Sequence, residues 1–120
     1  MVTIFNATKQ TLLGDRISVA DTGPTRNKGL LGHTGLAAGE GLWIIPTEAI
    51  HTFFMKFEID VIFVDKKMRV TKVVHSMKKW RIAMSWRAQS VVELPPGTAR
   101  QAKTVPGDFL EVRDHNGSTA

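Results

Sequence analysis

One short apolar run limits what this chain can fold into more than any other feature. Residues 59–64 carry a single charge, Asp60, and are flanked by Glu58 and Asp65. The run is rich in β-branched residues and too short for a core helix with its caps, so it predicts a strand buried on both faces. We therefore expect residues 59–64 to lie at the centre of the hydrophobic core, with the rest of the chain wrapped around them as sheets.

The composition is that of one ordinary domain. The chain has 120 residues, of which 42% are hydrophobic, so we expect a single β domain over residues 1–113 and a frayed tail over residues 114–120. The absence of cysteine excludes disulfides, thiolate metal sites and a cysteine nucleophile. Neither a signal-peptide pattern in the first 20 residues nor a run long enough to span a membrane is present. We expect a cytoplasmic protein without a membrane span.

Short strands separated by turn signals account for the remaining chain. We predict a turn at Gly14-Asp15, an irregular stretch over residues 76–84, and a first helix capped by Thr22 or Gly23 and stopped by Gly32. The predicted strands cover residues 2–6, 9–13, 16–20, 42–45, 61–65, 69–75, 85–94 and 109–113, and a helical turn capped by Thr98 covers residues 98–103. This pattern favours a mainly β fold, either a compact antiparallel sandwich or a barrel-like domain, with one or two short helices.

Several pieces of the sequence occur in an order that is found in a known family. They are Gly29-Leu30-Leu31 after Ala20-Asp21-Thr22, Gly39-Glu40-Gly41-Leu42 before Trp43, Phe53-Phe54-Met55-Lys56 before residues 59–65, and Glu93-Leu94-Pro95-Pro96-Gly97 before Gly107-Asp108. Over roughly residues 3–112 this set resembles the prokaryotic family called domain of unknown function one hundred and ninety-two. Phe54 stands where that family usually has Trp. The resemblance implies a mainly β fold of sandwich type and implies no activity, because the family has no established biochemical function.

The charge of the chain is unevenly distributed. The net charge is +5, and residues 66–92 hold half of the 16 basic residues and no Asp or Glu, with Trp80 and Trp86 interleaved. Cations beside exposed aromatic rings suit an anionic, stackable ligand such as single-stranded nucleic acid. The alternative is a solvated sheet edge guarded by lysines, with the two tryptophans covering the core.

Two carboxylates stand in apolar surroundings and are candidates for chemistry. Asp60 lies inside the central run, and Glu93 follows two valines. Lys56 is four residues before Asp60, which on a strand would place both side chains on one face. An acid/base pair formed by Asp60 and Glu93 and steered by Lys56 is one interpretation, and a buried ion pair that fixes strand register is the other.

Other catalytic and metal patterns are weak. A metal site at His51 with Glu58, Asp60 or Asp65 lacks the tight ligand spacing of known sites, so we expect no metal and no cofactor. Ser76 or Ser85 near His75 lacks the glycine-flanked turn of serine hydrolases.

We interpret the chain as a binding or accessory module rather than an enzyme. The expected site is a surface cleft beside the central strand for an anionic small molecule, glycan or nucleic acid. Its expected residues are Trp43, Phe54, Lys56, Lys78, Lys79, Trp80, Arg81, Trp86 and Arg87. A small hydrolase or lyase using Asp60 and Glu93 is one alternative, and a non-specific binder of single-stranded nucleic acid is another.

Overall fold

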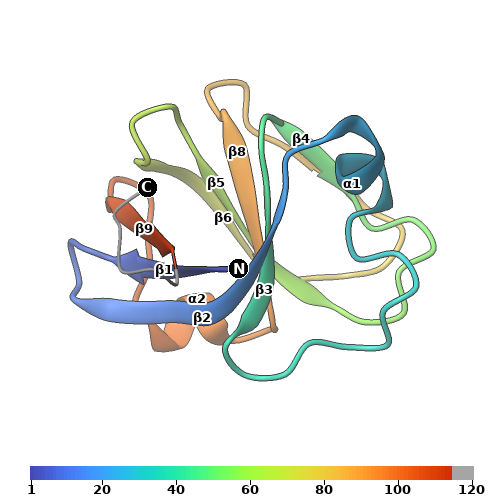
Figure 1. The fold of residues 1–120 in the computed structure, drawn as a ribbon, viewed down its shortest axis with the longest axis horizontal. Helices are drawn as coiled ribbons and strands as arrows, with labels where there is room; N and C mark the ends of the chain where they lie inside the picture. The colour runs from blue at the N-terminus through green and yellow to red at the C-terminus, as the bar shows by residue number, and fades with distance from the viewer. Residues whose placement is uncertain (115–120) are drawn as a thin grey trace.

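A curled seven-stranded sheet forms the body of the molecule in the computed structural model, which describes residues 1–114 (Figure 1). The strand order is β6-β5-β8-β3-β2-β1-β9, and β4 and β7 form a separate two-stranded ribbon. The strands are β1 (Val2–Asn6), β2 (Thr11–Ala20), β3 (Glu40–Ile44), β4 (Ala49–His51), β5 (Ile59–Val64), β6 (Val70–Met77), β7 (Ile82–Met84), β8 (Ser90–Leu94) and β9 (Leu110–Asp114). All neighbouring strands are antiparallel except β2 and β3.

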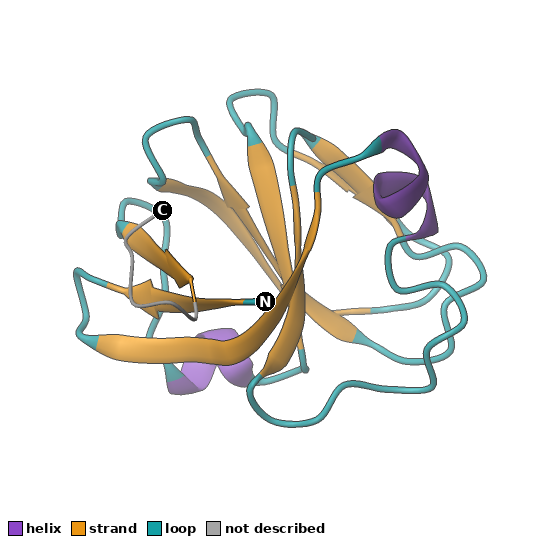
Figure 2. Cartoon of the chain, in the orientation of Figure 1, coloured by secondary structure: helices purple, strands orange, loops and turns teal. Residues whose placement is uncertain are grey.

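The sheet curls far enough for its two outermost strands to meet at one end. The backbone amide of Val70 donates to the carbonyl of Asp108, and that of Leu110 donates to the carbonyl of Met68, each at 2.8 Å. The amide of Gly107 donates to the carbonyl of Val70, also at 2.8 Å. These bonds join the start of β6 to the start of β9, so the sheet forms a half-barrel with a closed corner (Figure 2). The predicted mainly β, barrel-like fold with short helices is confirmed.

The strand β5 is buried on both faces, as its sequence predicts. All six of its residues are buried. Ile62 and Val64 belong to the core cluster that fills the inside of the curl, together with residues of β1, β2, β8 and β9. Ile59, Val61 and Phe63 belong to a second cluster on the outer face, which the β4–β7 ribbon and the segment after α1 cover. A strand covered on both sides cannot alternate apolar with polar residues, which explains the continuous apolar run.

Two short helices lie at different ends of the molecule (Figure 1). The helix α1 (Gly23–Lys28) is capped by Thr22, whose hydroxyl accepts from the Thr25 amide, and Pro24 lies in its first turn, as predicted. It ends earlier than predicted, with Gly29 rather than Gly32 as the cap. The helix α2 (Thr98–Gln101) begins after Gly97 in the left-handed conformation, so the predicted Thr98 cap is wrong. Ala99 and Ala102 of this segment pack into the inner core.

The predicted turn at Gly14-Asp15 is wrong, because β2 runs without interruption through both residues. Its register against β1 shifts there, as at a β-bulge. A Cβ at position 14 would lie 2.5 Å from Ile17 Cδ1 and 2.9 Å from the Gly39 carbonyl oxygen. The glycine therefore permits close packing of a bent strand rather than a reversal of the chain.

The sequence pattern did not predict the β4–β7 ribbon. No strand was expected at residues 49–51, and residues 82–84 were expected to be irregular, yet the two segments pair, with Ile50 opposite Ala83. The predicted strand over residues 85–94 begins only at Ser90. Asp114 ends β9, and the rest of the predicted tail, residues 115–120, lies outside the described residues. Neither α1 nor α2, the helices of residues 1–114, has the length or apolar character of a membrane-spanning segment.

Candidate functional site

A group of aromatic side chains lies on the surface where the loop after β4 meets the loop before β7. The Phe54 and Trp80 rings contact edge to face, with centroids 4.7 Å apart, and they are 71% and 53% exposed. Phe53 lies 5.8 Å from the same Trp80 ring and stacks on His51 at 4.9 Å. Large aromatic rings exposed together are uncommon on a protein surface and mark a place for a partner or ligand.

Thr52 brings these aromatic residues together. It is fully buried, and its hydroxyl donates to the carbonyl of Lys78 at 2.6 Å and accepts from the amide of Arg81 at 2.8 Å. Its own amide donates to the carbonyl of Arg81, and its carbonyl accepts from the amide of Trp80 at 3.1 Å. Phe54 and Trp80 both have positive φ, 63° and 62°, so each ring is presented from a tight turn that these bonds hold in place.

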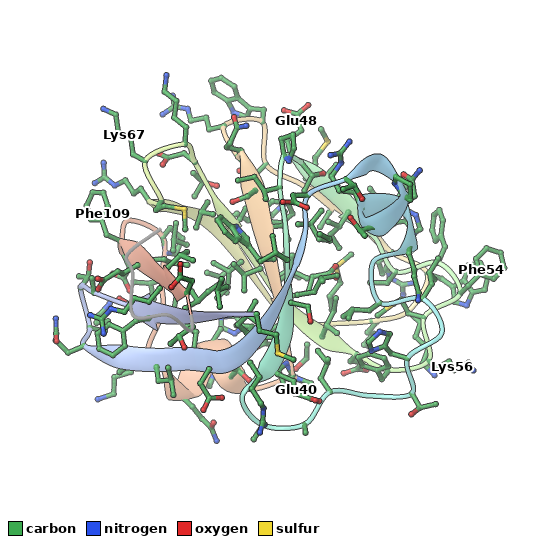
Figure 3. All side chains as sticks on the ribbon, viewed as in Figure 1. Glu40, Glu48, Phe54, Lys56, Lys67 and Phe109 are labelled. Atoms are coloured by element: carbon green, nitrogen blue, oxygen red, sulfur yellow. The ribbon has the colours of Figure 1, made fainter. Side chains whose placement is uncertain are left out.

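Cationic residues flank the aromatic residues along the chain. Lys56, Lys78, Lys79 and Arg81 are all exposed, and Arg81 Nη1 lies 3.3 Å from the carbonyl oxygen of Lys79. Phe54 and Lys56 project into solvent from one end of the molecule, whereas Lys67 projects from the other end (Figure 3). We call the set Phe53, Phe54, Lys56, Lys78, Lys79, Trp80 and Arg81 the aromatic–cationic surface.

The structure does not place the other expected residues at this surface. Trp43 lies on β3, packs against the inner core cluster and donates from Nε1 to the Ser90 hydroxyl at 2.9 Å. Trp86 and Arg87 follow β7, where the guanidinium lies 4.7 Å from the ring centroid, in a cation–π contact. The expected cleft lined by Trp43, Phe54 and Lys56 is therefore not formed, because Trp43 points into the curl of the sheet and Phe54 points to solvent.

The two candidate carboxylates lie on opposite faces of the sheet. In the pairing of β5 with β8, Asp60 is opposite Leu94, a residue of the inner core, whereas Glu93 is opposite Val61 of the outer cluster. Side chains of directly paired residues point to the same face. Asp60 and Glu93 are thus separated by the sheet itself, and the structure does not bring them together as an acid/base pair.

Asp60 is part of the structural framework. It is fully buried, and its carboxylate accepts from the amides of Ser76 at 2.8 Å and Ala99 at 2.9 Å. These two bonds tie β6 and the first turn of α2 to the central strand. Lys56, which was expected to steer Asp60, lies in the exposed loop before β5, where strand parity does not apply.

Glu93 differs from Asp60, because no group among residues 1–114 pairs with its carboxyl. It is 4% exposed, and no hydrogen bond or ion pair of its carboxylate is found among residues 1–114. It lines a pocket of about 250 Å³ between α1, β3 and β4. Burial raises the pKa of Glu93 from the ordinary 4.5 to about 7. Carboxyl groups with such a perturbed pKa in a pocket are concentrated at functional sites.

The remaining candidate residues have local structural contacts. His51 accepts from the Phe53 amide through Nδ1 at 3.2 Å, and no group of three or more His, Asp or Glu arranged for a metal occurs within residues 1–114. The hydroxyl of Ser85 is 2.9 Å from that of Thr71, and the Ser76 amide is bonded to Asp60.

Sequence reasoning missed the cations of α1 that line the Glu93 pocket. Arg26 and Lys28 lie about seventy residues before Glu93 in the chain, and only the fold brings them near the same cavity. A signal for Phe53 was present in the aromatic cluster before β5. For Arg26 and Lys28 the sequence carries none, since a basic last turn is common in short helices.

Comparison with known proteins places the chain in a family. The model of DUF192, described as an uncharacterised ACR, matches residues 3–112, and the chain belongs to this family. A UPF0127 protein of Thermococcus kodakarensis is 32% identical over 113 residues, which is 89% of this chain and 71% of that protein. A UPF0127 protein of Pyrococcus abyssi is 33% identical over 118 residues, covering 92% and 97% of the two chains. The predicted resemblance is therefore confirmed.

Two solved structures share the fold. A protein of Sinorhizobium meliloti, provisionally described as a transcription regulator, superposes with a TM-score of 0.78 at 20% identity and covers 92% of this chain and 91% of its own. A protein of unknown function from Novosphingobium aromaticivorans gives a TM-score of 0.75 at 23% identity, with 92% and 82% covered. At these identities the likeness establishes the architecture alone.

Proposed function

We propose that this protein is a binding module that holds an anionic ligand with a flat or apolar face, such as an acidic glycan, on the aromatic–cationic surface. The observation that carries the proposal is the exposed edge-to-face contact of Phe54 and Trp80 beside four exposed cations. An exposed ring offers a face for stacking, and the cations supply the attraction to charge.

Two further features support this proposal. The segment that presents Trp80 has no acidic residue from Lys66 to Val92, so nothing on it repels an anion. The hydrogen bonds of Thr52 fix both aromatic turns before a ligand arrives, which lowers the ordering cost of binding.

The experiment is calorimetric titration with a sulfated oligosaccharide at low and at moderate salt. The triple variant Lys78→Ala, Lys79→Ala, Arg81→Ala should weaken binding at least about tenfold, because three exposed cations beside the ligand are removed. Its salt dependence should also become shallower.

A matched control removes the same charge elsewhere. Lys66→Ala, Lys67→Ala, Arg100→Ala takes three exposed cations from the β5–β6 turn and from α2. This control should bind nearly as well as the unchanged protein, and Phe54→Ala should bind more weakly than the control. Equal loss in both triple variants would mean that net charge alone attracts the ligand, and the proposed surface would be rejected.

Single-stranded nucleic acid is a second candidate, because exposed apolar residues continue along β7. Every second residue from position 80 to position 86 is a large, exposed apolar side chain. The exposed fractions are 53% for Trp80, 67% for Ile82, 55% for Met84 and 75% for Trp86. Stacking of a base on an aromatic side chain contributes about 1–3 kcal/mol. A titration with an unstructured oligonucleotide, followed by tryptophan fluorescence, tests this candidate. In Trp80→Phe the oligonucleotide should still quench the fluorescence of Trp86. If the oligonucleotide does not quench the fluorescence of the unchanged protein at low salt, this candidate is rejected.

A further inference from the structure

The pocket beside α1 is a second place where this protein can hold a small molecule. Glu93 comes from β8, near the middle of the seven-stranded sheet, and its side chain lines the pocket on the outer face. The apolar part of the wall is formed by Leu30, Leu31, Ile44, Ile50 and Met55, and polar groups line the larger part of the pocket. A pocket of about 250 Å³ suits a ligand smaller than a typical drug.

The Glu93 carboxyl has no partner inside the protein. The ion pair of Lys9 with Asp108 and that of Arg113 with Glu111 do not involve Glu93, and no hydrogen bond of its carboxyl is found among residues 1–114. Its neighbours on the paired strands, Leu42 and Val61, are apolar. A buried carboxyl without a partner is costly, and nearly all buried polar groups in proteins are hydrogen-bonded. Water or a ligand that hydrogen-bonds to the Glu93 carboxyl therefore reaches it through the pocket.

Cations lie along the same pocket on α1. Arg26 and Lys28 both line it, and neither is close enough to Glu93 to form an ion pair. A molecule that fills the pocket would thus meet one acidic group, an apolar wall and two basic groups. Those three elements match an ammonium, a short hydrocarbon portion and a carboxylate within one molecule.

We propose that the pocket binds a small amino-acid-like zwitterion, with its ammonium group on the Glu93 carboxylate, its hydrocarbon portion against Ile50 and Met55, and its carboxylate beside Arg26 and Lys28. The ligand pairs the buried acid and replaces the missing hydrogen bonds. This site shares no residue with the aromatic–cationic surface, although His51, which lines the pocket, stacks on Phe53 of that surface.

Protonation of Glu93 controls this binding. The charged and titratable groups facing the pocket are Glu93 on β8, Arg26 and Lys28 on α1, and His51 on β4, while the facing residues of β3 and β5 are apolar. An ammonium ligand needs the ionised carboxylate, so affinity should rise as the pH increases from about 6 to about 8. The bound ammonium should in turn lower the pKa of Glu93.

The test uses three probes of similar hydrocarbon size: L-leucine, isopentylamine and isovalerate. The Glu93 carboxyl is followed by carbon-13 NMR during pH titration of the unchanged protein with each probe. L-leucine and isopentylamine should lower the pKa of Glu93 and bind measurably at millimolar concentration, whereas isovalerate should do neither. Glu93→Gln should lose L-leucine binding by at least about tenfold.

Control variants separate the parts of the proposal. Glu58→Gln removes an exposed carboxylate just before β5 and should leave L-leucine binding unchanged. Arg26→Ala combined with Lys28→Ala should weaken L-leucine but not isopentylamine. Equal binding of L-leucine to the unchanged protein and to Glu93→Gln, or an unaltered Glu93 titration with both amines, would overturn the proposal. Neither result would affect the oligosaccharide titration, so the two proposals fail separately.

Discussion

Replacing Glu93 by Gln should make the protein more stable at neutral and alkaline pH. The pKa of this carboxyl is ordinarily 4.5 and is raised to about 7 by burial in the folded protein. Below pH 4.5 the group is protonated in both the folded and the unfolded chain, so it adds no pH-dependent difference. Between pH 4.5 and about 7 the unfolded chain releases its proton while the folded chain retains it, and the free energy of unfolding falls.

The size of this effect follows from the two pKa values. Their difference corresponds to about 3 kcal/mol, since one pH unit is worth about 1.4 kcal/mol. The penalty is complete above about pH 7 and absent at pH 4. Gln resembles the protonated acid in shape and charge, so Glu93→Gln should gain about 3 kcal/mol at pH 8 and little at pH 4. For a chain of this length the gain at pH 8 is a rise of roughly 10 °C in Tm.

The assay is urea unfolding of both proteins at several pH values between 4 and 8, without added ligand. Other titrating groups act equally in both proteins, so the difference between their unfolding free energies isolates Glu93. Glu58→Gln, an exposed site, should show no such pH-dependent difference. A Glu93→Gln gain that is the same at pH 4 and pH 8, or a loss at pH 8, would refute the assignment of Glu93 as a buried acid without a partner.

Three further substitutions test the framework around the two proposed sites. Asp60→Asn puts an amide donor against a backbone N–H and should cost about 1–3 kcal/mol in urea unfolding; a neutral result would contradict its framework role. Thr52→Val removes the hydroxyl that joins the two aromatic turns, so Trp80 fluorescence should shift and the free energy of unfolding should fall by about 1–3 kcal/mol. An unshifted emission spectrum would argue against that linkage. Gly41→Ala should destabilise the protein by about 1–3 kcal/mol, because the added Cβ would lie 2.6 Å from the Glu93 carbonyl oxygen. Its control, Gly35→Ala, adds a Cβ with nothing within 4 Å and should leave thermal unfolding unchanged. Equal Tm values for the two variants would contradict the packing argument.

The central strand could be predicted from the sequence because burial on two faces leaves a local signature. Both faces of residues 59–64 are buried, so apolar residues occupy consecutive positions instead of every second one. The β4–β7 ribbon could not be found in this way. Each strand has three residues, and only Ile50 and Ala83 of the ribbon belong to the core cluster, so the alternation is too short to recognise.

Glycine misled the prediction at one point for a physical reason. A glycine beside an aspartate suggests a turn, because glycine adopts backbone angles that other residues avoid. Gly14 instead allows close packing, since Ile17 and Gly39 leave no room for a Cβ at this position. Which of these two roles a glycine plays depends on contacts from distant parts of the chain, and the local sequence does not contain them.

The candidate sites were accessible to sequence reasoning only in part. Phe54 and Trp80 were both singled out, but their contact depends on Thr52, which joins two loops 26 residues apart. Glu93 was recognised as a carboxyl in apolar surroundings, yet its predicted partner points to the other face of the sheet. Strand pairing decides such questions, and a register shift of one residue would have reversed the answer.

The pairing of β1 with β9 has a consequence for how the chain matures during synthesis. β1 is made about a hundred residues before β9, its second neighbour in the sheet. Until β9 emerges from the ribosome, one edge of β1 has no strand beside it and the corner between β6 and β9 stays open. Completion of the sheet therefore waits for β9, and a nascent chain halted before residue 107 should bind chaperones that recognise exposed strand edges.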